Sequence, residues 1–167
     1  MIKLATPVSH LFENKEYEET IVKESDVLEC RDRSVNYDKH LDKQELFHCE
    51  LQPIHEWSDL EWKFLQKIKD TKPNLKLLTL HAASCCDKPV LIRKIFELGG
   101  REYTRKEMKY FAKTNFLKIK SIFGSSVEIA IENNNYYPTE AYRDVTEAKF
   151  ISEIVNDNDL RFLFDIA

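Results

Sequence analysis

The sequence is poor in the residues that mark disordered or disulfide-rich chains. Its 167 residues include only three glycines and five prolines, which argues against a low-complexity or disordered chain. The four cysteines (Cys30, Cys49, Cys85 and Cys86) form no C-x-x-C pair and no zinc-ribbon spacing. No apolar run is long enough to span a membrane, and the first residues lack the pattern of a signal peptide. We therefore expect a cytoplasmic protein with reduced thiols and no membrane partner.

A surplus of basic residues is also absent. The formal net charge is -4, and lysines alternate with glutamates along the chain. Nucleic-acid binders usually carry a basic surface, because neutralising phosphates supplies much of their affinity. The alternation is typical of solvated helix faces, so we do not expect a nucleic-acid partner.

What the sequence does contain is an alternation of strand and helix patterns from end to end. Apolar runs bounded by turn residues predict strands, and apolar residues at spacings of three and four predict helices. Strands are predicted over 2–6, 27–30, 45–51, 75–81, 127–132 and 160–165. Helices are predicted over 15–24, 57–69, 89–98 and 103–123, and either one helix or two short ones over 139–156. The polar stretch 35–43 is compatible with a helix.

This order of elements predicts an α/β fold with a parallel sheet. The run 75–81 (LKLLTLH) is nearly all apolar, as in a strand buried on both faces. No glycine-rich phosphate loop follows the first strand, which disfavours a dinucleotide-binding fold. We therefore predict a parallel (β/α)8 TIM barrel. Because a complete barrel takes roughly 250 residues, residues 1–167 are interpreted as one incomplete domain that stops after about six strands.

Four potential metal ligands lie on successive predicted strands, the first within the strand 45–51 and the other three at the ends of theirs. They are His48, His81, Glu132 and Asp165. In these barrels the active site lies at the carboxyl ends of the strands, so the four side chains are expected to converge. Two imidazoles and two carboxylates would suit a divalent ion such as Mn, Zn, Fe or Co. Alternatively, each histidine is a hydrogen-bonded structural residue, Glu132 accepts backbone N–H groups, and Asp165 caps a helix.

The segment 129–142 (IAIENNNYYPTEAY) and the run 162–167 (FLFDIA) resemble the xylose-isomerase-like TIM-barrel superfamily. That group includes sugar isomerases and epimerases, the endonuclease IV family and multinuclear non-heme iron oxidases. The resemblance implies that Glu132, in its Glu-Asn motif, and Asp165 are metal ligands. His48 and His81 correspond by strand order to the histidines of the endonuclease IV branch.

The resemblance implies a metal-dependent sugar or sugar-phosphate isomerase or epimerase. In that hypothesis Glu132 is catalytic, and Asn133, Asn135 and Tyr136 bind a polyol substrate. The alternatives are a multinuclear non-heme iron-dependent oxidase acting on a peptide, and a truncated, non-catalytic barrel. A repair endonuclease ranks lower because a basic surface is lacking. Besides the small-molecule substrate, the expected partners are a second copy of the chain or a complementing C-terminal barrel segment.

Overall fold

The computed structural model describes residues 2–165 and contains one six-stranded parallel sheet. The strands are β1 (Ala5–Pro7), β2 (Val27–Arg31), β3 (Gln44–His48), β4 (Leu77–His81), β7 (Glu128–Glu132) and β8 (Arg161–Leu163). They lie in the order β1-β2-β3-β4-β7-β8, and every neighbouring pair is parallel. The prediction of an α/β fold with a parallel sheet is confirmed. Closure of the sheet into a barrel stays a prediction.

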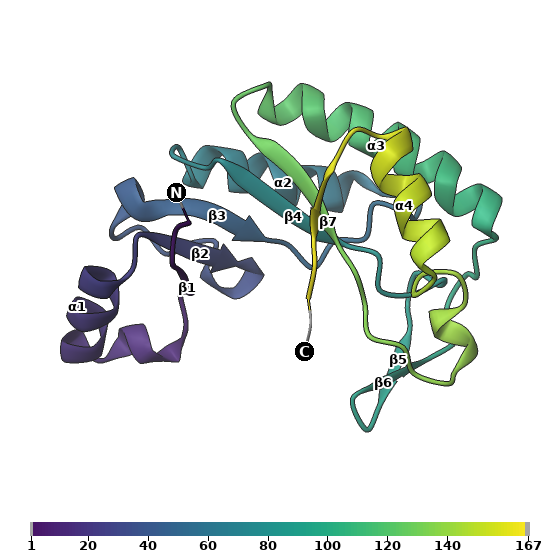
Figure 1. Ribbon diagram of the computed structural model, residues 1–167, viewed down its shortest axis with the longest axis horizontal. Coiled ribbons are helices and arrows are strands. Elements are labelled where there is room, and N and C mark those ends of the chain that lie inside the picture. The colour runs from purple at the N-terminus through teal and green to yellow at the C-terminus, as the bar shows by residue number, and fades with distance from the viewer. Residues whose placement is uncertain (1, 166–167) are drawn as a thin grey trace.

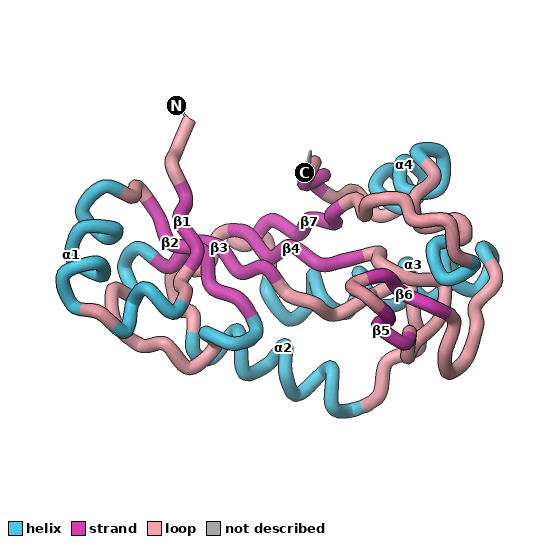
Figure 2. Tube along the Cα trace, turned by 90° about the horizontal axis from the view of Figure 1, so that it is seen from below, coloured by secondary structure: helices cyan, strands magenta, loops and turns pink. Residues whose placement is uncertain are grey.

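Four α-helices accompany the sheet among the described residues. They are α1 (Lys15–Glu24), α2 (Asp59–Thr71), α3 (Arg105–Phe123) and α4 (Ala148–Asp157). Figure 2 shows the sheet curved, with the helices along its outer side and no α-helix of residues 2–165 over its inner side. A doubly wound fold would place helices on both faces. The arrangement is therefore compatible with part of an α/β barrel.

The hydrophobic core lies between the outer face of the sheet and α2, α3 and α4. Side chains alternate along a strand, so Phe47, Leu78 and Ile131 face the helices while their neighbours face inward. The helices contribute Leu65, Phe116 and other residues that are almost fully buried. Burying such a side chain stabilises the fold by roughly 1.5–3 kcal/mol. The same alternation directs the polar residues at the strand ends into the inner side of the sheet.

One helix prediction is wrong. Residues 89–98 form a β-hairpin of β5 (Val90–Ile92) and β6 (Ile95–Glu97), which pair in antiparallel fashion. The β-branched residues at 90, 92 and 95 favour strands over helices. The chain turns at Arg93 and Lys94, whose φ values are 51° and 69°. Gly99 closes the base of the hairpin, where a Cβ would lie 2.4 Å from the carbonyl oxygen of Lys88.

The segment 35–43 is also not a helix. It contains the end of one short 3-10 turn, a loop and a second 3-10 turn over Leu41–Lys43 that begins at His40, where φ is 54°. The loop carbonyls are bound from outside, because Lys72 and Gln44 donate to them. These bonds replace the internal bonds that a helix would have made.

Asn115 of α3 fixes the connection that follows β3. Its Nδ2 donates to the backbone oxygens of Pro53 and His55, each at 2.8 Å, and its side chain is buried. This contact ties the loop after His48 to the long helix outside the sheet. Within residues 2–165, no helix is both long and apolar enough to cross a membrane.

Replacing Asn115 by alanine should lower the free energy of unfolding by about 2–3 kcal/mol, because two buried carbonyl groups lose their donor. Urea denaturation followed by circular dichroism measures this change. Lys113→Ala is the matched control on the exposed side of the same helix and should change stability by less than about 0.5 kcal/mol. Equal effects of the two substitutions would contradict the anchoring role of Asn115.

Candidate metal centre

The candidate site forms where three neighbouring strands end. His48 is the last residue of β3, His81 of β4 and Glu132 of β7. In the sheet register His81 lies opposite Glu132, and His48 lies opposite Thr79, two residues before His81. Residues in register share a face, and so do residues two apart on one strand. The three side chains therefore project from the same side of the sheet, at its carboxyl edge.

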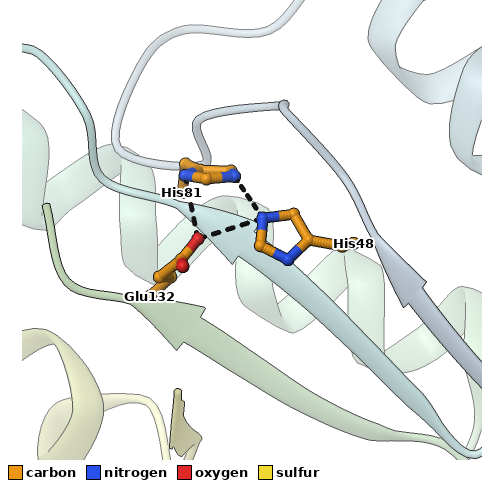
Figure 3. A group of neighbouring side chains, drawn as sticks. All are labelled: His48, His81 and Glu132. Carbon is orange, nitrogen blue, oxygen red and sulfur yellow. Dashed lines mark hydrogen bonds and ion pairs between the residues drawn. The ribbon is translucent and has the colours of Figure 1, made fainter. Parts of the chain in front are cut away.

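The ligand atoms of these side chains converge on one point (Figure 3). The Nε2 of His48 lies 3.0 Å from Oε2 of Glu132, and Nδ1 of His81 lies 3.3 Å from the same oxygen. The two Nε2 atoms of the histidines are 2.6 Å apart. One ligand atom from each residue lies within 4.8 Å of the others. The predicted convergence of His48, His81 and Glu132 is confirmed.

The charges and contacts of His48, His81 and Glu132 favour a bound cation. Oε2 of Glu132 is buried and accepts no well-directed hydrogen bond from any described residue. Burial by itself lowers the pKa of His48, but the contact with Glu132 outweighs it and the net shift raises the pKa. Burial lowers the pKa of His81, and the neighbouring His48 lowers it further. Two ring nitrogens this close cannot both carry protons toward each other, so His81 is the neutral member with a lone pair to offer.

The donor set fits a transition metal. Two imidazoles and one carboxylate bind zinc in catalytic sites, and the same combination with open positions is typical of non-heme iron(II). A buried carboxylate is unfavourable unless a positive charge compensates it, and a divalent ion held among these three side chains would do so. His48, His81 and Glu132 could therefore hold one divalent ion.

Asp165 is not among the three converging residues. It follows β8, and its backbone is fixed by Asn133, whose amide donates to the Asp165 carbonyl and accepts from its N–H. The assignment of Asp165 as a ligand stays a prediction.

The proposed substrate residues differ in how they are held. The side-chain amide of Asn133 forms two hydrogen bonds with the backbone of Asp165 and so connects the segments that follow β7 and β8. Asn135 and Tyr136 are exposed in the segment after β7. Substrate binding by these three residues stays a prediction.

Sequence reasoning missed two charged residues beside the site. Arg31 lies opposite His48 in the register of β2 and β3, and its Nε donates to Oε1 of Glu29 at 2.7 Å. The negative charge of Glu29 raises the pKa of His48, and the positive charge of Arg31 lowers it. The signal was present in the run 27–31 (VLECR), because its charged residues occupy alternate positions of a short strand and so share one face.

A cavity of about 730 Å³ opens beside this edge of the sheet. Its wall includes Arg31 and Glu50, which follows His48 by two residues, together with Arg33, His10 and Tyr37. The lining combines charged side chains with apolar surface from Val8 and Phe12. A cavity of this size can hold a polar small molecule.

No protein-family model matches the chain, and no curated protein matches it at a significant level. The fold and the site therefore define this molecule as an α/β protein with a parallel sheet and a candidate metal centre of two histidines and one glutamate. The superfamily suggested by residues 129–142 stays a prediction.

Proposed function

We propose that this chain provides the metal centre of a metal-dependent enzyme of the (β/α)8 type. The observation that carries the proposal is the convergence of His48, His81 and Glu132 from three adjacent strands, with both ring nitrogens within 3.3 Å of the buried Oε2 of Glu132. Residues at the carboxyl ends of parallel strands supply the chemistry in such enzymes.

Each ligand has a role that follows from its position. His48 and His81 offer neutral ring nitrogens once a metal displaces the proton shared between them, and Glu132 neutralises part of the metal charge. A bound divalent ion would supply Lewis acidity toward a substrate oxygen or a bound water. Arg31 and Glu50 line the adjacent cavity and can orient a polar substrate.

For the reaction, the first candidate is a sugar or sugar-phosphate isomerase or epimerase. The charged residues Arg31 and Glu50 in the cavity wall and the asparagines after Glu132 support a substrate rich in hydroxyl groups. In this proposal Glu132 is the catalytic carboxylate, Asn135 and Tyr136 bind the polyol, and Asn133 contributes the second hydrogen of its amide group, since the first is donated to the Asp165 carbonyl. The four buried free thiols support action in a reducing compartment such as the cytoplasm.

The second candidate is an iron-dependent oxidase that acts on a peptide. The donor set itself favours it, because two histidines and one carboxylate are the ligands of many oxygen-activating iron sites. In either proposal, further parallel strands pair with the outer edges of β8 and β1 to complete the barrel. A second copy or another barrel segment supplies them.

One experiment separates the two candidates. The protein is loaded anaerobically with Fe(II) in one sample and with Mn(II), Zn(II) or Co(II) in others. An isomerase should interconvert members of a panel of aldose, ketose and epimer pairs without consuming oxygen. An oxidase should show oxygen uptake with a peptide pool in the Fe(II) sample alone. His81→Ala should abolish either activity, and turnover that survives this substitution would reject the proposed centre.

A further inference from the structure

The β5–β6 hairpin projects from the same end of the sheet as the candidate metal centre. It follows His81 of β4 after a connecting segment, and Figure 1 shows it beyond the carboxyl ends of β4 and β7. Its base is tied down, because Gly99 and Gly100 approach Lys88 closely and Asp87 accepts the N–H of Arg101. The hairpin is therefore a fixed two-stranded arm.

One edge of this arm is already occupied. The N–H of Phe96 on β6 donates to the hydroxyl of Tyr142 at 3.1 Å, and the hydroxyl of Thr139 donates to the carbonyl of Phe96 at 2.6 Å. The rings of Phe96 and Tyr142 also stack, with centroids 5.9 Å apart. The segment 139–142 thus covers the outer edge of β6.

The opposite edge, on β5, is open within residues 2–165. Leu91 lies opposite Phe96 in the hairpin register. The backbone groups of Phe96 point away from β5, so this is a non-hydrogen-bonded pair, and the N–H and C=O of Leu91 point away from β6. No other described strand pairs with β5. Leu91 therefore presents one donor and one acceptor to an incoming strand.

The side chains of β5 are also unusually exposed. Val90, Leu91 and Ile92 have 51%, 62% and 52% of their surface accessible, although all three are large and apolar. An exposed apolar strand edge invites pairing with another chain, and proteins usually protect such an edge. Here the described part of the chain leaves it uncovered.

Three cations lie close to β5 along the chain, one shortly before the strand and two in the turn that follows it. Lys88, Arg93 and Lys94 form no ion pair with any residue in 2–165, and Glu97 is the single acid between positions 88 and 97. Arg93 and Lys94 occupy two left-handed positions of a tight hairpin turn, where Asn-Gly would be less strained. Backbone strain is often found at functional sites, so the strained and charged residues of this exposed turn suggest that their charge contributes to binding.

We propose that the outer edge of β5 is a docking strand for an extended, acidic segment of another protein. The segment adds a third strand to the hairpin, exchanges two backbone hydrogen bonds with Leu91, and packs apolar side chains against Val90 and Ile92. Its acidic residues face Lys88, Arg93 and Lys94. This surface is separate from the three metal ligands, so the proposal does not depend on the proposed enzyme activity.

The test uses a fluorescein-labelled peptide of nine alternating valine and glutamate residues, titrated with the intact protein and followed by anisotropy. Control peptides replace glutamate by lysine, or carry N-methyl groups that block strand pairing. We expect saturable binding of the acidic peptide alone. In 15N spectra of the protein, the amide of Leu91 should shift on binding and exchange more slowly with solvent.

Two protein variants assign the binding to this edge. The double variant Arg93→Asn, Lys94→Gly removes both cations while favouring the same turn, and should weaken binding about tenfold. Leu91→Pro removes the outward N–H without taking a bond from the hairpin, and should abolish binding. A circular dichroism spectrum like that of the wild-type protein, and a cooperative thermal transition with a midpoint no lower than about 5 °C below the wild-type value, establish that both variants are folded.

Three outcomes would overturn the proposal. The first is equal binding of acidic, basic and N-methylated peptides, and the second is a set of amide shifts that excludes Leu91. The third is self-association that Leu91→Pro abolishes while the peptide fails to bind, which would identify a second copy as the occupant of the edge.

Discussion

Replacing Glu132 by alanine should reduce the affinity of the chain for Zn(II) or Fe(II) by more than about 100-fold. Loss of residues that merely support a metal ligand already costs about 10–100-fold, and Glu132 is the only carboxylate in the converging trio. His48→Ala and His81→Ala should have effects of similar size, because each removes one of three ligand atoms. Metal content by mass spectrometry and competition titration with a chromophoric chelator measure the loss.

Glu128→Ala is the matched control for this series. Glu128 lies on the same strand as Glu132, is exposed, and forms a surface ion pair with Arg161 that should contribute little to stability. Asp165→Ala in the same series decides whether the carboxylate after β8 is a fourth ligand. Stoichiometric metal in a folded Glu132→Ala protein would contradict the proposed centre.

Metal binding by the wild-type chain should also weaken at acid pH. The pKa of His48 is raised, so below that pKa a proton occupies the nitrogen that the metal needs. Affinity should then fall by up to about tenfold per pH unit for each proton displaced. A metal affinity that does not change as the pH falls through the pKa of His48 would show that His48 is not a ligand.

The second large effect is expected at Lys72, at the end of α2. Its side chain is buried, and its Nζ donates to the carbonyl oxygens of Ser34 and Tyr37 and to the side-chain oxygen of Gln44. Gln44 in turn donates to the carbonyls of Tyr37 and Lys39. The ammonium group of Lys72 therefore links Ser34 and Tyr37, in the connection between β2 and β3, to Gln44 at the start of β3.

Lys72→Met should lower the free energy of unfolding by about 3 kcal/mol. Methionine fills much of the space, but one buried and two partly buried acceptors lose a charged donor. Each such bond contributes about 1.5–3 kcal/mol, and the cost of burying the charge offsets part of the sum. For a chain of this size the thermal midpoint should fall by roughly 6–12 °C. Differential scanning calorimetry measures the shift.

Lys67→Met on the exposed side of α2 is the control for Lys72 and should leave the midpoint within about 2 °C of the wild-type value. Hydrogen exchange adds a local readout, since the amides of residues 34–44 should exchange faster in Lys72→Met than in the control. A midpoint that is equal in both variants would mean that the loop carbonyls find other donors.

Several helix boundaries could be predicted because local chemistry specifies them. Ser58 and Glu61 form a capping box at the start of α2, and Thr104 and Glu107 form another at the start of α3. These side chains satisfy the free N–H groups of the first turn, so the helices begin where the sequence provides the caps. Gly124 ends α3 with a φ of 72°, a conformation that favours glycine.

The hairpin over residues 90–97 could not be predicted in the same way. Its short apolar run is ambiguous between helix and strand, and a contact 43 residues away decides the outcome, since Thr139 binds the carbonyl of Phe96. The segment 35–43 is not a helix for a similar reason, because the carbonyl of Tyr37 accepts a hydrogen bond from Lys72 at the end of the distant helix α2.

For the candidate site, the sequence by itself determined which residue types end the strands. His81 and Glu132 each close an apolar run, so their position at one edge of a parallel sheet followed from the pattern. His48 lies within the predicted run 45–51, and only the structure shows that β3 ends at this residue. Only the tertiary structure decided that these three side chains share one face and meet within 4.8 Å. Strand pairing sets the register, and a shift of one residue would have turned a ligand to the opposite face.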